Sequence, residues 1–250
     1  MLLALDTTSP PGSAALLLPD GRCVTVAGDA RPFGEQLPGT LHDLVSRHGH
    51  RLGEIDVFAV TVGPGSLTGL RVGIATVQGL AFASGRPCVG VSIFDALAWA
   101  WLVGAAPRAG DLLGLWLDAR RDEVFTALLR RTGRAIDDDA AVGELVDLVD
   151  APGVGAAEER LEGWRKLVSP GSTLSCCGTR VLADRAALAS LAPEVSFVDV
   201  PTVLASAVAE VAQREVRHGR TVRPHALHPL YVRRPDVEVA RDRAHLVTDK

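Results

Sequence analysis

The amino-acid sequence predicts an α/β fold with two duplicated units, each a mixed sheet flanked by helices. Apolar runs of strand length alternate along the chain with segments of helical period, which is the order of sheets covered by helices. An apolar strand at 57–62 leads through a glycine turn into a helix at 68–84, a junction typical of such folds. The order strand, acidic turn, strand begins both at residue 2 and at residue 112, and this repetition indicates two related units.

The first unit is expected to open with an antiparallel meander. Strands at 2–6 and 13–18 flank a turn at 7–12, and a third strand lies near 23–26 after an Asp-Gly turn. The apolar strand that follows is continuous, which is typical of burial on both faces of a sheet. After the meander we expect a helix at 37–48, a strand at 57–62, a helix at 68–84, a strand at 87–91 and a helix at 94–103.

A second unit is expected after a linker of glycine, alanine and proline at 104–110. We therefore divide the chain into an N-terminal lobe at 1–104 and a smaller C-terminal lobe at 105–250. The expected elements of the second lobe are strands at 112–117, 124–130 and 174–178, and an amphipathic helix at 202–218 with Val208 and Val211 inside. We expect exposed connections at 137–139 and 151–163, and a charged, partly loose tail from Arg233 onward.

Composition and charge restrict the class of protein. With 250 residues, 47% of them hydrophobic, the chain is long enough to bury a substantial core. The net charge of -4 argues against unaided binding to nucleic acid, because that binding needs a concentrated basic surface. No apolar run has membrane-spanning length and the start carries no basic leader, so we expect a cytoplasmic protein.

The cysteines and histidines show no metal-binding or redox pattern. Four cysteines, two of them adjacent at Cys176 and Cys177, lack Cys-x-x-Cys spacing. The histidine pairs at 48 and 50 and at 225 and 228 lack the helical i, i+4 spacing of a metal pair. We therefore expect no metal site.

The glycine turn has a chemical reason at each position. Gly63 and Gly65 permit backbone angles and close approaches closed to other residues, and Pro64 stiffens the turn between them. Ser66 or Thr68 is suited to cap the helix that follows. This junction is a place where an α/β fold presents backbone amides to a phosphate or to a partner.

The helix at 68–84 is expected to have two different faces. Its apolar stripe has the spacing of one buried face and comprises Leu70, Ile74, Val77 and Ala81. The small residues lie largely off that stripe and comprise Gly69, Ala75, Thr76, Gly79 and Ala83. Each interior glycine costs about 1 kcal/mol relative to alanine, so Gly69, Gly73 and Gly79 indicate a close approach by another segment. Spacing alone leaves open whether that segment belongs to this chain or to a partner.

The first hairpin turn carries an acid and two hydroxyls at Asp6, Thr7 and Thr8. Duplicated β-β-β-α-β-α halves with such a turn resemble the superfamily of actin, sugar kinases and heat-shock chaperones. The resemblance implies that the acid and hydroxyls of the turn contact phosphate and metal. A strand-end carboxylate that only caps its own turn is the other interpretation of Asp6.

Four segments, in this order and spacing, resemble the TsaB family, also called YeaZ. They are Leu3-Ala4-Leu5-Asp6-Thr7-Thr8, Gly63-Pro64-Gly65-Ser66-Leu67-Thr68-Gly69-Leu70-Arg71-Val72-Gly73, Asp118-Ala119-Arg120-Arg121 and Pro229-Leu230-Tyr231-Val232-Arg233. The match spans nearly the whole chain, and its long glycine segment is the most specific part. The resemblance implies a non-catalytic scaffold subunit of the bacterial complex that places threonylcarbamoyl on the adenosine beside the anticodon of certain tRNAs.

The resemblance also implies partners and a surface for them. The subunit would pair with its paralogue TsaD, the transferase, and be joined by the ATPase TsaE; it would form a homodimer where TsaD is absent and meet tRNA only through the complex. The helices at 37–48 and 68–84 would contact TsaD or a second copy. The expected interface residues are Leu37, Leu41, Leu44, Gly69, Leu70, Gly73, Thr76, Val77 and Leu80.

The resemblance implies no catalytic residue, metal or required cofactor in this chain, although ATP or ADP is expected at the complex. The metal-ligating histidines of TsaD correspond here to Ile93 and Leu97, which cannot bind a metal. A vestigial nucleotide cleft would be lined by Asp6, Thr7, Thr8, Gly63, Gly65 and Ser66. The family segment Arg-x-His-Ser-Glu reads Arg31-Pro32-Phe33-Gly34-Glu35 here and keeps its glutamate.

Three rival interpretations remain at this point. A small-molecule kinase of the same superfamily would use the turns at Asp6 and Asp118 to bind ATP and a metal. A transferase or protease is opposed by the residues at positions 93 and 97. A homodimeric binding module would associate with itself and ignore TsaD.

Overall fold

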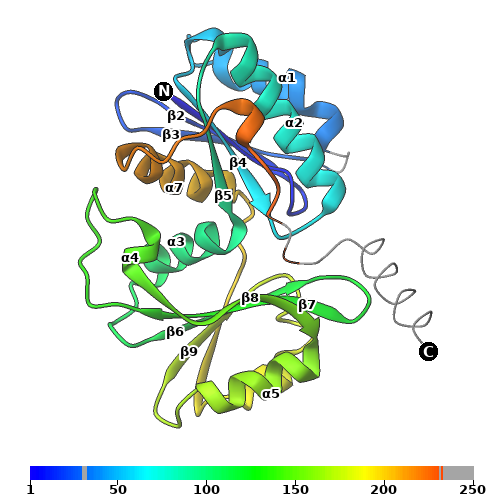
Figure 1. The fold of residues 1–250 in the computed structure, drawn as a ribbon, viewed down its shortest axis with the longest axis vertical. Coiled ribbons are helices and arrows are strands. Elements are labelled where there is room, and N and C mark those ends of the chain that lie inside the picture. The colour runs from blue at the N-terminus through cyan, green and yellow to red at the C-terminus, as the bar shows by residue number, and fades with distance from the viewer. Residues whose placement is uncertain (30–32, 231, 233–250) are drawn as a thin grey trace, which may run out of the picture.

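Two five-stranded mixed sheets with the same strand order form the fold (Figure 1). The computed structural model describes residues 1–29, 33–230 and 232. The first sheet has the order β3-β2-β1-β4-β5, with β1 (Leu2–Asp6), β2 (Ser13–Leu17), β3 (Cys23–Ala27), β4 (Val57–Gly63) and β5 (Cys88–Ser92). The second has the matching order β8-β7-β6-β9-β10, with β6 (Leu112–Asp118), β7 (Glu123–Arg131), β8 (Val146–Ala156), β9 (Thr173–Cys177) and β10 (Glu194–Val198). The predicted α/β fold class with duplicated halves is confirmed.

Helices cover both sheets. The α-helices are α1 (Phe33–Ser46), α2 (Leu67–Ser84), α3 (Ile93–Ala105), α4 (Val142–Leu145), α5 (Ala157–Leu167), α6 (Arg185–Ala189) and α7 (Ala205–Arg217), with short 3-10 turns at η1 (Leu52–Glu54) and η2 (Pro224–Ala226). In Figure 1, α1 and α2 lie beside each other on the outside of the first sheet. Within the described residues, no helix is both long enough and apolar enough to cross a membrane.

Strand pairing in the first sheet brings two turns to one edge. β1 runs antiparallel to β2 and parallel to β4, with Leu2 opposite Val57 and Leu5 opposite Val60. Because neighbouring parallel strands end at the same edge, the turn after Asp6 lies beside the turn after Gly63. This pairing positions the site described below.

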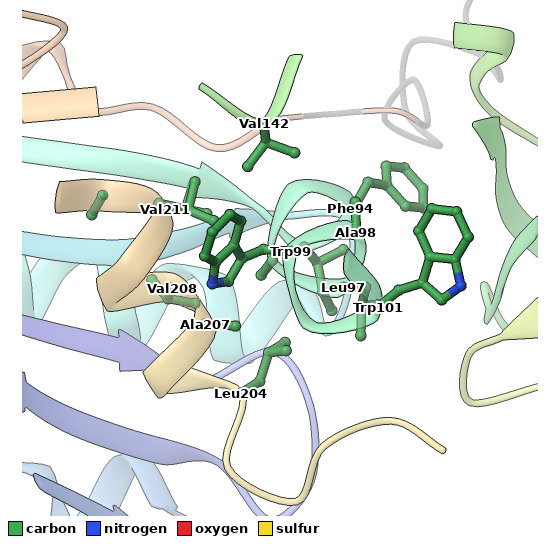
Figure 2. Packing of buried hydrophobic residues seen from close by; sticks show 14 of the residues in the cluster. Phe94, Leu97, Ala98, Trp99, Trp101, Val142, Leu204, Ala207, Val208 and Val211 are labelled. Carbon is green, nitrogen blue, oxygen red and sulfur yellow. The ribbon is translucent and has the colours of Figure 1, made fainter. Parts of the chain in front are cut away.

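The last helix of each half packs against the other half. α7 lies against β1 and β2, and the backbone N–H of Ala205 at its start donates a 3.0 Å hydrogen bond to Ser13 Oγ. α3 contacts β6 and α4 of the second half. Figure 2 shows Trp99 of α3 directed toward Val208 and Val211 of α7, with Trp101 on the opposite side of α3. Both tryptophans are buried, so a shared apolar core joins the two lobes.

The expectation of an exposed connection at 151–163 is wrong. That segment contains the end of β8 and most of α5. The carboxylate of Asp150 accepts hydrogen bonds from the Arg160 guanidinium and, at 2.8 Å, from Trp164 Nε1. The side chain of Arg160 lies directly over Gly153, where an added Cβ would lie 3.1 Å from it. The absence of a side chain at Gly153 and Gly155 therefore lets Arg160 pack directly on the backbone of β8.

Several element bounds also differ from the expectation. α1 begins at Phe33, and β10 and α6 were not expected. A series of turns follows residue 178 and precedes the five-residue α6. The charged tail from Arg233, together with Arg31, Pro32 and Tyr231, lies outside the described residues.

Candidate functional site

A buried carboxylate organises the turn after β1. Asp6 is 1% exposed, and its Oδ1 accepts hydrogen bonds from the Thr8 backbone N–H at 2.9 Å and from Thr8 Oγ1 at 2.7 Å. Thr61 Oγ1, on the neighbouring strand β4, donates a third bond of 2.9 Å to the same oxygen. One oxygen of Asp6 thus ties its own turn to the strand that leads into the glycine turn.

The glycine turn after β4 fits closely against this first turn. Gly63 has a φ of 116°, a backbone conformation that favours glycine. A Cβ added at Gly65 would lie 2.8 Å from the Cβ of Thr8. Ser66 is the N-cap of α2, and its Oγ accepts a 3.3 Å hydrogen bond from the Gly69 backbone N–H. The two turns therefore form one packed unit at the edge of the sheet.

The first turn of α2 receives the side chain and the carbonyl of Thr7. Thr7 Oγ1 donates a 2.7 Å hydrogen bond to the Gly69 carbonyl oxygen. A Cβ added at Gly69 would overlap the Thr7 carbonyl oxygen, and one added at Gly73 would overlap Thr7 Oγ1. The close approach expected at these two glycines is thus made by this chain itself. The third helical glycine, Gly79, has no heavy atom within 4 Å of an added Cβ.

The six residues expected to line a nucleotide cleft lie together at this edge of the sheet. Thr7 and Thr8 pack closely against Gly65, Gly69 and Gly73. The carboxylate and hydroxyl groups of the turn bind one another and the backbone of α2. Nucleotide binding at this cleft stays a prediction.

The side chain of Arg180 lies beside the corresponding turn of the second sheet, which follows Asp118. The Asp118 backbone N–H donates a 3.0 Å hydrogen bond to Thr179 Oγ1, just after β9. The Arg180 guanidinium lies 3.8 Å from Asp118, 3.9 Å from Asp122 and 3.2 Å from Asp184. The charge of Asp118 is therefore compensated within the chain.

The predicted interface residues are mostly buried in the core of the first lobe. Leu37, Leu41 and Leu44 of α1 pack in the same cluster as Leu70 and Val77 of α2. Gly73 is buried, whereas Gly69, Thr76 and Leu80 are half-buried. Their burial leaves these apolar side chains little surface for direct contact with a partner, and the list implied by the resemblance stays a prediction.

The outer face of α2 consists of different residues. The exposed positions are Leu67, Thr68, Arg71, Ala75, Gly79, Phe82 and Ala83. Phe82 is 82% exposed, the highest value among large apolar side chains in the described part of the chain. α1 flanks this face, since a Cβ added at Gly34 would lie 3.0 Å from Val72. An aromatic residue among small ones was the sequence signal that could have identified this surface.

The two positions that the resemblance matches to metal ligands of TsaD are apolar and buried. Ile93 is 3% exposed and Leu97 is 1% exposed, and both lie in the core between the lobes. The described residues contain no group of three or more His, Cys, Asp or Glu side chains suited to hold a metal ion.

Buried thiols and one carboxyl have shifted pKa values. Burial raises the pKa of Cys88 to about 11 and that of Cys176 to about 12, so neither is poised as a thiolate nucleophile. Asp95 keeps access to solvent but lines a hollow of about 320 Å³ between α3, α4 and α7. Loss of hydration by the surrounding elements, and then the charge of Glu215, raises the pKa of Asp95 to about 6. No nucleophile accompanies it among the residues that line the hollow.

Comparison with known proteins places these features in context. Residues 28–228 match the family model described as TsaD, tRNA N6-adenosine threonylcarbamoyltransferase. An uncharacterized protein of Mycobacterium tuberculosis is 31% identical over 95% of this chain and 93% of its own. The Escherichia coli tRNA threonylcarbamoyladenosine biosynthesis protein TsaB is 32% identical over 54% of this chain.

Coverage of the relatives varies. The match spans 57% of the E. coli protein and 56% of a Mycobacterium leprae relative. Among solved structures, YeaZ from Pseudomonas aeruginosa aligns with a TM-score of 0.69 and 25% identity, over 92% of this chain and 99% of that one. The whole architecture is therefore that of a known structure.

Proposed function

Because the chain belongs to the TsaB (YeaZ) family, within the group that the TsaD family model describes, we propose that it takes part in tRNA threonylcarbamoyladenosine biosynthesis as a scaffold. In this role it binds the TsaD paralogue and stabilises the conformation in which TsaD transfers the threonylcarbamoyl group. A scaffold acts through a difference in its affinity for two states of its partner.

The observation that carries this proposal is the outer face of α2. Small side chains at Ala75, Gly79 and Ala83 surround an exposed Phe82, and Gly79 has open space above it. Small residues let a second helix approach closely, and an aromatic side chain supplies a large apolar contact. This surface suits a helix of TsaD, or of a second copy of the chain when TsaD is absent.

We further propose that the chain supplies neither a catalytic residue nor a required cofactor. The occupied turn at Thr7, the ion pairs of Arg180 and the buried Ile93 and Leu97 support this role. TsaE joins the pair, and ATP or ADP binds to the complex. With a net charge of -4, the chain meets tRNA through its partners in the cytoplasm.

The proposal is tested by reconstitution of threonylcarbamoyl transfer to tRNA. TsaD and TsaE from the same organism are assayed with this chain, without it, and with the Phe82→Asp variant. We expect transfer with the unmodified chain and little transfer in the other two mixtures. Equal transfer without the chain would contradict the scaffold role, and ATP turnover by the chain alone with a small acceptor would instead indicate a kinase.

A further inference from the structure

A C-terminal strap, residues 220–230, closes one edge of the first sheet. Val222 forms an isolated antiparallel bridge to Cys88 on β5, with both backbone N–H···O distances at 2.8 Å. The strap then turns through η2 and buries Leu227 in the core of the first lobe, next to Gly90. The bridge satisfies backbone groups at an edge strand that would otherwise be open to pairing.

One side chain of α2 holds the strap. Gln78 Nε2 donates two hydrogen bonds of 3.0 Å each, to the carbonyl oxygens of Pro224 and Leu227. In a helix, Gln78 neighbours Ala75 at i-3 and Phe82 at i+4, and both of these are exposed on the outer face. Gln78 therefore stands at the boundary between the strap and the proposed partner surface.

The strap ends at the glycine turn. The Leu230 backbone N–H donates a 2.7 Å hydrogen bond to the Val62 carbonyl oxygen. The Leu230 carbonyl oxygen lies 3.0 Å from the position of a Cβ added at Gly63. The strap thus contacts α2 through η2 and Gln78, and it also contacts the turn from which α2 begins.

The two lobes differ at this feature. α2 has 18 residues and carries the strap, whereas its counterpart α6 has five. In the described residues, the single isolated bridge is the one between Cys88 and Val222, and β10, the counterpart of β5, has none. The strap therefore accompanies the long helix and not the duplicated fold as such.

We propose that the strap is a brace that orients α2 for its partner, and that Gln78 is the positioning residue through which it acts. This inference rests on the proposed function, because it concerns the TsaD-binding face of α2. The brace fixes the rotation of α2 about its axis and thereby the direction of Phe82.

The test compares Gln78→Leu with Gln213→Leu, a matched control at a half-buried glutamine on α7. The full chain is measured for affinity to TsaD, for hydrogen exchange of the Cys88 and Val222 amides, and for Tm. We expect Gln78→Leu to speed exchange at both amides and to weaken TsaD binding by up to about tenfold, because the loss of one to two net hydrogen bonds lowers the population of the braced conformation by no more than that factor. Gln78→Glu, which opposes a carboxylate to the same carbonyl oxygens, should weaken binding further.

Different results overturn different claims. Faster exchange with unchanged TsaD affinity would make the strap a structural element without a positioning role. Unchanged exchange in Gln78→Leu would show that Gln78 does not hold the strap. Failure of the unmodified chain to bind TsaD would contradict the proposed function, and the positioning role with it.

Discussion

At the scale of single residues, Thr7 is the link between the first hairpin and α2. Its hydroxyl and its carbonyl oxygen occupy the space left by two glycines, and its hydrogen bond joins residues 62 positions apart. The cost of glycine in a helix indicated from sequence that something approaches closely. It could not indicate what, because the approaching residue belongs to a distant strand end.

The Thr7 hydroxyl can be tested by a nearly isosteric change. Thr7→Val removes the donor to the Gly69 carbonyl oxygen and should lower the free energy of unfolding by about 1 kcal/mol. Urea denaturation measures the change, with Thr7→Ser as the control that keeps the hydroxyl. A loss in Thr7→Ser without a loss in Thr7→Val would indicate that packing of the methyl group, and not the hydrogen bond, is responsible.

Gly73 and Gly79 form a matched pair in one helix. Gly73→Ala places a methyl group against Thr7 Oγ1 and should destabilise the fold by about 1–3 kcal/mol. Gly79→Ala meets open space and should stabilise it by about 1 kcal/mol through helix propensity. Thermal unfolding measures the Tm of both variants, and Gly73→Ala should have the lower value. Similar Tm values would contradict the packing described for Thr7.

Asp95 should make stability depend on pH. Its folded pKa of about 6 lies above the unfolded value of about 3.9, so the folded state holds the proton more tightly. The contribution of Asp95 to stability should therefore fall as the pH rises from about 4 to about 6. Asp95→Asn should raise Tm at pH 7.5 but not at pH 4, by a modest amount because solvent reaches the carboxyl. An equal rise in Tm at pH 7.5 and at pH 4 would show that the raised pKa of Asp95 is not the cause.

At the scale of elements, the stripe of α2 was predictable and its outer surface was not. Spacing alone placed Leu70, Ile74, Val77 and Ala81 on one buried face, as the structure has them. The family resemblance assigned apolar residues of α1 and α2 to a partner, including Leu70 and Val77 of this stripe, and both are buried in the core of the first lobe. Periodicity separates inside from outside but does not say which apolar contacts are made within the chain.

Phe82→Asp tests the outer surface of α2 directly. Phe82 is 82% exposed, so the change should alter stability by less than about 0.5 kcal/mol while it removes TsaD binding. The matched control is Leu182→Asp, since Leu182 is 76% exposed and lies outside α2. Affinity is measured by calorimetry with purified TsaD. Equal effects of the two variants would exclude a specific role for this face.

The segment around β8 and α5 shows where composition misleads. Glycine, alanine and charged residues at 151–163 are typical of an exposed connection. The segment is nevertheless strand and helix: β8 pairs with β7, and Asp150 of β8 binds Arg160 and Trp164 of α5. These contacts join Asp150 to side chains that are ten and fourteen positions further along the chain. Local composition does not predict contacts over such separations.

At the scale of the whole molecule, duplication explains why the two sheets share one strand order. The packing of α3 and α7 against the opposite half explains how the two lobes are held together. α7 covers the first sheet and α3 meets the second, and the Arg214 guanidinium lies 3.8 Å from the centre of the Trp99 ring between them. The repeated strand order could be predicted from the acidic turns at 6 and 118. The packing of α3 and α7 against the opposite half could not be predicted. The apolar residues of these helices show that each has a buried face, but not which of the two sheets that face covers.

The asymmetry of the two halves carries the functional argument. Both halves have a hairpin turn after their first strand. In the first half this turn places Thr7 against α2, and in the second half Arg180 forms an ion pair with Asp118 of the turn. The first half alone has a long helix with a free face of small residues and an aromatic side chain. These differences support a protein that contributes a surface to an assembly.

The central claim is that this chain forms a specific complex with TsaD, and light scattering of the two purified proteins tests it most directly. The account predicts that an equimolar mixture elutes with the mass of a heterocomplex, and that Phe82→Asp returns the masses of the separate proteins. A mixture that keeps those separate masses with the unmodified chain would contradict the account.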